Sequence, residues 1–158
     1  MDAFHGIVAE LDYPMYVVTA AAEGERSGCL AGFGTQCSID PARFVICISK
    51  ANHTFGVARA APTLVVHVLR GGDRRLAELF GTETGDDVDK FDRCEWEPGP
   101  DGIPVLDGLD WFAGRVLERH DVGDHVAMVL EPFAGRHEHH APQLGFQALR
   151  DLEPGHDA

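Results

Sequence analysis

The sequence predicts a mainly β protein, a barrel of short strands with a few short helices. Short runs rich in β-branched and aromatic residues alternate with turn residues along the chain. Only a few segments show the spacing of apolar residues that is typical of an amphipathic helix. We find no internal repeat and no linker. Many short strands with few helices indicate a β barrel.

The first quarter of the chain is predicted to hold one helix and two strands. Apolar residues recur at helical spacing over residues 4–11, and a following proline ends this helix. Met15–Ala22 is rich in β-branched and aromatic residues and is predicted to be a strand. Ser27–Ser38 is predicted to be a second, long strand interrupted by glycines. Gly32 and Gly34 indicate a bulge or a close approach of another group.

The next segment alternates strands and helices. Phe44–Ser49 is nearly all apolar and is therefore predicted to be a strand buried on both faces. Asn52 is a plausible N-cap for a short helix over His53–Ala61. A further strand, Thr63–Leu69, leads to the helix Arg74–Phe80, which Asp73 is predicted to cap.

The second half is predicted to contain a long hairpin. Gly81–Asp92 is polar and acidic and is predicted to be a loop. Leu109–His120 and His125–Pro132 are predicted strands, joined by the turn residues Asp121–Asp124. Pro142–Leu152 completes the domain.

Composition excludes several classes of function. At 158 residues, one domain over residues 1–158 is the expectation. Thirteen lysine and arginine residues against 26 acidic residues give a net charge of −13, which argues against nucleic acid and anionic membranes as partners. No apolar run approaches the ~20 residues that span a bilayer, and we see no signal peptide.

The four cysteines, Cys29, Cys37, Cys47 and Cys94, show no C-x-x-C spacing. We interpret them as small core hydrophobes with free thiols. The absence of a disulfide framework favours a cytoplasmic location.

The run Ser27–Lys50 has the composition of a surface for a large, flat, polar ligand. Its small residues let a ring system approach the backbone closely. The polar side chains of Thr35, Gln36 and Ser38 can satisfy the ligand's oxygens and nitrogens. Lys50, next to a predicted helix start, suits a terminal phosphate.

Several short motifs occur along the chain in one fixed order, although each alone is weak. They are Tyr13-Pro14 with Val17–Thr19, Ser38–Pro41, Phe44–Lys50, Thr63–Leu69 with Leu76–Phe80, Gly102–Gly108, and Gly123-Asp124-His125. In this order they resemble the flavin reductase-like family, the FMN-binding split β-barrel proteins. The resemblance covers about residues 13–150.

The resemblance implies an FMN-binding split β-barrel, a homodimer, FMN or FAD as cofactor, and NAD(P)H as hydride donor. Reduced flavin would then pass electrons to a partner such as a monooxygenase. The alternative is a flavin-binding electron carrier, similar to flavoredoxins, without nicotinamide turnover. The sequence departs from the family pattern at Ala42, which follows Pro41, and at His67, where asparagine is common.

For a flavin ligand, the residues themselves indicate roles at single positions. Ala31 and Gly32 would offer backbone N–H groups to the ring, and Thr35, Gln36 and Ser38 would bind its edge and the ribityl chain. His125 would face the nicotinamide. The phosphate would lie at Ser49, Lys50, Asn52 and Thr54.

Ordinary structural explanations remain open for these residues: strand polarity facing water, a bulge, a helix cap beside a solvated lysine, and a hairpin histidine bonded to its own turn. His67, in an apolar strand, is interpreted as a core histidine with satisfied hydrogen bonds.

Other chemistry is poorly supported. The imidazoles and carboxylate of His137–His140 could chelate zinc or nickel. Adjacent loop residues seldom face one ion, however, so we interpret this run as a solvated loop and predict no metal site. No serine or cysteine lies in a recognisable nucleophile signature. The apolar strands and the face of Leu76–Phe80 need cover, which favours an isologous dimer.

Overall fold

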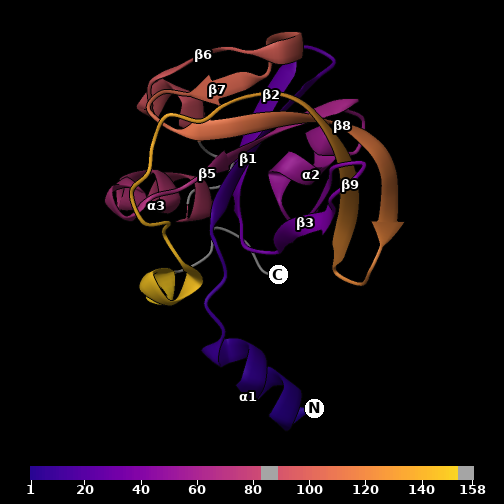
Figure 1. Cartoon of the computed structure of the whole chain (residues 1–158). Coiled ribbons are helices and arrows are strands. Elements are labelled where there is room, and N and C mark those ends of the chain that lie inside the picture. Colours follow the sequence, from indigo (N-terminus) through magenta and orange to yellow (C-terminus); the bar gives the residue numbers. More distant parts are fainter. Residues whose placement is uncertain (83–88, 153–158) are drawn as a thin grey trace.

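A single antiparallel sheet organises the chain in the computed structural model, which describes residues 1–82 and 89–152. Its strands are β1 (Tyr16–Ala22), β2 (Glu25–Ala31), β3 (Gly34–Ser38), β4 (Arg43–Ser49), β5 (Thr63–Val68), β8 (Asp110–Asp121) and β9 (His125–Arg136). They lie in the order β2-β1-β5-β8-β9-β4-β3, with the long β8–β9 hairpin prominent in Figure 1. The predicted mainly β architecture is confirmed.

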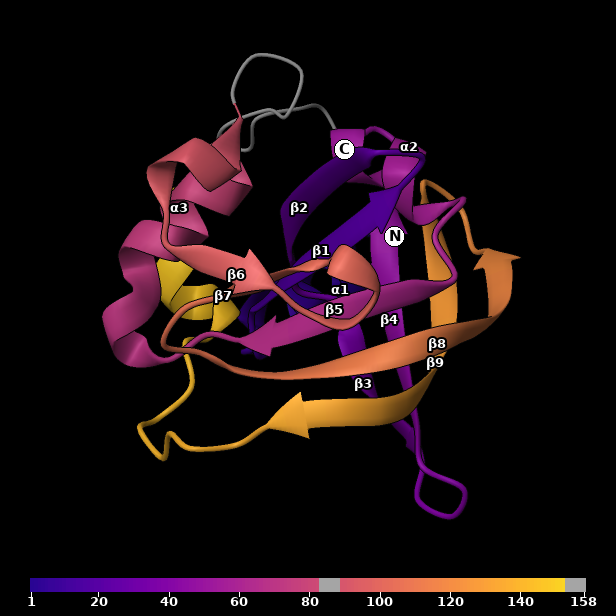
Figure 2. The same cartoon turned by 90° about the horizontal axis from the view of Figure 1, so that it is seen from above.

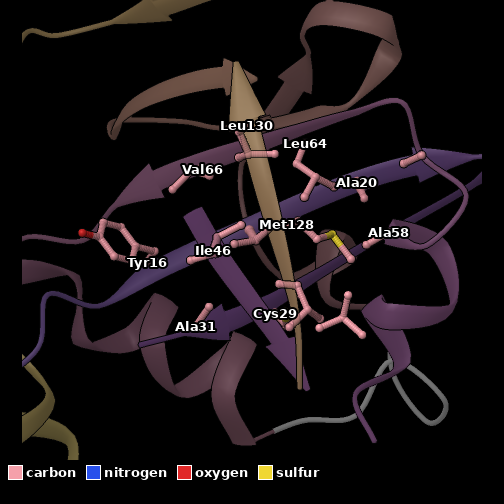
Figure 3. Close-up of a cluster of buried hydrophobic side chains, with 14 of the residues drawn as sticks. Tyr16, Ala20, Cys29, Ala31, Ile46, Ala58, Leu64, Val66, Met128 and Leu130 are labelled. Atoms are coloured by element: carbon pink, nitrogen blue, oxygen red, sulfur yellow. The ribbon is translucent and has the colours of Figure 1, made fainter. Parts of the chain in front are cut away.

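The sheet curls around one apolar core, to which strands from both of its halves contribute. Alternate residues of β1 and β4 point inward, and the short helix α2 (His53–Ala58) packs against β1, β2 and β4. Figure 3 shows side chains from opposite parts of the sheet converging, among them Tyr16, Ile46, Met128 and Leu130. Burying this apolar surface is the main favourable term that closes the sheet.

A second apolar layer covers the outer face of β1. It is formed by α3 (Arg74–Thr82), β7 (Pro104–Leu106), which pairs with β6 (Trp96–Pro98), and the turn η4 (Phe146–Leu149). Figure 2 shows α3 and the β6–β7 pair beside β1. Ala77 and Phe80 of α3 are buried against this layer. The predicted need for a second subunit to cover this helix face is therefore wrong, because the chain covers it itself.

The N-terminal helix α1 (Asp2–Glu10) lies apart from the barrel (Figure 1) and has no buried residue. It is held at its end by Gln147, whose side-chain amide donates to the carbonyl oxygens of Ala9 at 2.9 Å and Leu11 at 2.8 Å. Its apolar residues Phe4 and Ile7 are exposed. Within residues 1–82 and 89–152, no helix is long and apolar enough to cross a membrane.

Some predicted boundaries are wrong. Ser27–Ser38 is not one strand, because the chain leaves the first sheet edge after Ala31 and joins the other edge at Gly34. The strand Phe44–Ser49 is not buried on both faces: Ile46 and Ile48 point into the core, while Val45 and Cys47 on the other face are half-buried. Strands β1 and β5 are the ones buried along nearly their whole length, because β7 packs over them and α3 packs over the neighbouring β2.

The observed helices differ less from the predicted boundaries than the strands do. Helix α2 ends at Ala58, earlier than the predicted Ala61. Asp73 closes the turn η1 (Gly71–Asp73) before α3, where its carboxylate accepts from the backbone N–H of Arg70 at 2.7 Å. The predicted acidic loop contains the turn η2 (Lys90–Arg93), and its residues 83–88 lie outside the described residues.

All four cysteines are free, as predicted. Only Cys29 is fully buried, and burial raises the pKa of its thiol to about 11. Cys37 is exposed, so its interpretation as a core residue is wrong. It lies where the pairing of β3 with β4 is irregular, between Gln36 and Ser38, and this places the predicted bulge there instead of at Gly32 and Gly34.

His67 is a core histidine with two satisfied ring nitrogens, as predicted. Its Nδ1 lies 2.9 Å from the carbonyl oxygen of Val17, which can only accept, and its Nε2 accepts from the N–H of Leu106 at 3.0 Å. The ring is therefore neutral with the proton on Nδ1. Burial lowers its pKa to about 4, although the Val17 bond opposes this shift.

This histidine should make stability depend on pH. The unfolded chain takes up a proton near pH 6.5 and the folded chain only near pH 4, so stability is lost as pH falls through that window. At pH 4.5 the loss amounts to about 2 kcal/mol of unfolding free energy. We expect urea denaturation to show this fall in the wild type and a fall smaller by that amount in His67→Gln. The control is exposed His120→Gln, and equal pH slopes for wild type and His67→Gln would contradict the prediction.

Candidate functional site

The edge strand β3 carries exposed polar side chains. Thr35 and Gln36 pair with Val45 and Phe44 of β4, and both side chains face solvent. The Thr35 hydroxyl donates to the carbonyl of Gln36 at 3.3 Å, and the Gln36 amide donates to the carbonyl of Ser38 at 3.1 Å. A shallow hollow is lined by Gln36, Cys37, Ser38, Ile39 and Asp40. Within the described part of the chain, the Thr35 and Gln36 side chains bond to local backbone carbonyls, so they can turn to a ligand.

The small residues before this edge have packing roles inside the chain. A Cβ added to Gly34 would lie 2.6 Å from Cδ1 of Ile46 and 3.2 Å from the carbonyl oxygen of Val45. At Gly32 a Cβ would lie 3.1 Å from the sulfur of Met15. Ala31 is buried, with its methyl group in the barrel core opposite Tyr16. The packing of the neighbouring strand therefore favours glycine at position 34, whatever binds outside.

The far end of β4 gathers a second polar group. Ser49 is buried and its hydroxyl accepts from the N–H of Ala51 at 3.2 Å. Asn52 caps α2 as predicted, with its side-chain oxygen 2.9 Å from the N–H of Thr54. The Thr54 hydroxyl lies in the interior, 2.8 Å from that of Ser27. Of the predicted phosphate ligands, the Thr54 side chain therefore faces the core.

The Lys50 side chain reaches across to the β8–β9 hairpin. Its ammonium lies 2.7 Å from a carboxylate oxygen of Asp121, and its backbone N–H donates to the carbonyl of Asp124 at 2.9 Å. The hydrogen bond from Lys50, the N–H of Gly123 and the lysine charge together lower the pKa of Asp121. Lys50, the one surface lysine among the described residues, thus forms an ion pair with a carboxylate of this hairpin.

His125 stands opposite Ser49 in the β4–β9 ladder. Its Nδ1 lies 2.7 Å from a carboxylate oxygen of Asp124, and this bond with the imidazole lowers the pKa of Asp124. The Phe33 ring, 53% exposed, lies 5.0 Å from the imidazole. Tyr13 packs edge-on against Phe33 at 6.1 Å. With Nδ1 held by Asp124, the remaining nitrogen is the one available to a ligand.

The structure thus brings the predicted residues together in two groups along β4. Thr35 lies level with Val45 toward one end, and His125 lies level with Ser49 at the other, on the same face of the sheet. Four residues separate these levels, a distance of roughly 13 Å along a strand. Sequence reasoning missed Phe33 because an isolated aromatic in a glycine-rich run gives no periodic signal.

A separate cluster surrounds buried Asp110. One carboxylate oxygen accepts from the N–H groups of Glu138 at 2.8 Å and His139 at 3.0 Å, and Arg70 donates to the other at 3.2 Å. The rings of His137 and His139 approach at 3.3 and 2.9 Å. Burial alone would raise the pKa of Asp110, but these hydrogen bonds hold it well below its usual range.

The loop predicted to be solvated is therefore anchored to β8 through this carboxylate. No three metal-binding side chains are grouped to hold an ion anywhere in the described part of the chain.

The antiparallel sheet and its polar edge strand define the class of protein as a small β-barrel domain. The family described as the flavin reductase like domain matches residues 8–151, and the chain belongs to it. The resemblance inferred from the ordered motifs is confirmed.

Individual proteins similar to this chain agree with the family assignment. The chain is 31% identical over 124 residues to the FMN reductase (NADH) RutF of Methylorubrum extorquens, covering 78% of this chain and 60% of that protein. It therefore spans about three fifths of the length of such relatives.

Two solved structures show the same fold. A flavin reductase domain protein from Arthrobacter sp. FB24 superposes with a TM-score of 0.84 over 93% of this chain and 91% of that one, at 20% identity. An FMN-binding protein from Thermus thermophilus, crystallised with 1-cyclohex-2-enone, gives 0.74 over 80% and 71%, at 27% identity.

The packing at Gly34 leads to a prediction about stability. Gly34→Ala should lower the unfolding free energy by about 1–3 kcal/mol, because its Cβ would meet Ile46 and the fixed backbone of Val45. Gly56→Ala, in α2 with nothing within 4 Å, is the matched control and should be stabilising by about 0.5–1 kcal/mol. Urea denaturation measures both. Equal stability of Gly34→Ala and wild type would contradict the packing role.

Proposed function

We propose that this chain is an NAD(P)H-dependent flavin reductase that binds FMN, or alternatively FAD. The observation that carries the proposal is the arrangement along β4 in a member of this family: an exposed polar edge at one end, and His125 beside Lys50 at the other. The relative from M. extorquens is named an FMN reductase (NADH), which supports both the cofactor and the donor.

The residues present fit a flavin mononucleotide. Thr35, Gln36 and Ser38 would bind the ring edge and the ribityl chain, because their side chains are exposed or half-exposed along one strand. Ala31 and Gly32 would contribute through their backbone only, since the Ala31 side chain is buried and the space at Gly32 is occupied by Met15.

The phosphate would lie at the other end of β4. Lys50 would supply the positive charge, and Ser49 and Asn52 would supply hydroxyl and amide groups near it. Thr54 would contribute by holding the helix start, since its hydroxyl is committed to Ser27. A charged ammonium with several hydrogen-bond donors is a common way to bind a phosphate dianion.

His125 would orient the nicotinamide. Flavin bound at this site supplies the acceptor for a hydride and passes the electrons on. Asp124 holds the imidazole in place through Nδ1, and Phe33 offers an exposed aromatic face beside it. The chain's contribution is therefore positioning, in which donor and acceptor are held about 3–3.5 Å apart, not a nucleophile of its own.

A second candidate is a flavin-binding electron carrier without nicotinamide turnover. The T. thermophilus structure, described as an FMN-binding protein, favours this class. The polar edge supports a flavin site in either case, and only turnover separates the two.

Further parts of the proposal concern partners. We propose a homodimer, supported by the half-buried outer face of β4 and by the exposed apolar side chains of Phe33, Leu117 and Phe133. Reduced flavin would pass electrons to a partner such as a monooxygenase. A cytoplasmic location agrees with the free thiols.

The first test is flavin binding followed by turnover. Titration of FMN with the purified protein should quench flavin fluorescence to saturation, and the complex should oxidise NADH or NADPH, with bleaching of the visible flavin bands. Bound FMN without nicotinamide oxidation would favour the carrier. Absence of flavin binding would contradict the whole proposal.

The second test concerns His125. His125→Asn should slow flavin reduction in single-turnover measurements by about 10- to 100-fold, because the group that orients the donor is lost. FMN affinity should change little, since the phosphate and ring contacts remain. His120→Asn, exposed on the same hairpin, is the control and should reduce flavin at the wild-type rate. An unchanged rate in His125→Asn would remove this residue from the reaction.

A further inference from the structure

The ammonium of Lys50, which is proposed to bind the flavin phosphate, already forms an ion pair with Asp121. The ammonium is 2.7 Å from Oδ2 of Asp121, and the two side chains are 39% and 70% exposed. The other carboxylate oxygen, Oδ1, accepts from the N–H of Gly123 at 3.1 Å, which fixes the carboxylate in the hairpin turn. Asp124 adds a second negative charge close to the same lysine.

No other lysine can replace Lys50 at this surface. The chain has two lysines, and the second, Lys90, is buried, with its ammonium donating to the carbonyl oxygens of Gly28 and Phe80 at 3.1 Å each. The chain as a whole carries a net charge of −13, so an approaching dianion meets a repulsive field. The charges of the residues around Lys50 therefore contribute strongly to the affinity of this surface for a phosphate.

We propose that Asp121 competes with the flavin phosphate for Lys50 and thereby sets how strongly the site prefers phosphorylated over unphosphorylated flavin. This inference rests on the proposed function. In the flavin-free protein Asp121 holds the ammonium. When the phosphate binds, it displaces this carboxylate from the ammonium. Because the ion pair must be broken, the phosphate binds more weakly than it would to an unpaired lysine.

The test compares two flavins in one variant. Asp121→Asn removes the charge but keeps a side-chain oxygen for the N–H of Gly123, so the turn is retained. Fluorescence titration should show FMN binding about two- to five-fold more tightly than in wild type, the range expected for releasing an exposed ion pair. Riboflavin, which lacks the phosphate, should bind with unchanged affinity.

Two controls separate this pairing from general charge effects. Glu118→Gln makes the same change in net charge on the same hairpin, away from Lys50, and should leave FMN affinity within error of wild type. Lys50→Gln should weaken FMN but not riboflavin, and adding Asp121→Asn to Lys50→Gln should give no further change if the effect runs through the lysine.

Several outcomes would overturn the inference: unchanged or weaker FMN binding in Asp121→Asn, an equal change for riboflavin, an equal gain in Glu118→Gln, or a gain that persists without Lys50. Wild-type protein that binds neither flavin would instead contradict the proposed function itself.

Discussion

The pairing of β4 with β9 is the constraint on which the candidate site depends. This ladder sets Ser49 opposite His125 and brings Lys50 to the hairpin that carries Asp121 and Asp124. Because side chains alternate between the faces of a sheet, a slip of one residue would turn these groups to the other face. The apolar residues of the same strands oppose such a slip, since Ile46 and Ile48 would leave the core.

The barrel is asymmetric in how it is covered, and this asymmetry decides where a ligand can lie. Strands β1 and β5 are buried along nearly their whole length, because β7 packs over them and α3 packs over the neighbouring β2. Within residues 1–82 and 89–152, the outer faces of β3 and β4 stay exposed or half-buried over most of their length. The polar side chains of Thr35 and Gln36 therefore lie on an accessible edge, while the most rigidly packed strands serve as support.

Acidic residues of the β8–β9 hairpin engage both the ammonium of Lys50 and the imidazole of His125. Asp121 pairs with Lys50, and Asp124 bonds to His125, so each functional group has a carboxylate partner before any ligand arrives. For the imidazole of His125, such a partner is an advantage, because it fixes the orientation of the ring. For an ammonium that is to bind a phosphate, it is a competitor. One short turn thus has opposite effects on the two halves of the site.

The sequence by itself determined the strand-rich architecture, the cap of α2 at Asn52, the core role of His67 and the ordered motifs of the family. These are short-range signals, set by alternation, capping and burial within a few residues. Only the tertiary structure decided that Ser27–Ser38 divides between two sheet edges, that the Thr54 hydroxyl faces inward, and that Phe33 covers His125. Such contacts join residues far apart in the chain, and they follow from strand register and sheet curvature, which no local pattern of residues encodes.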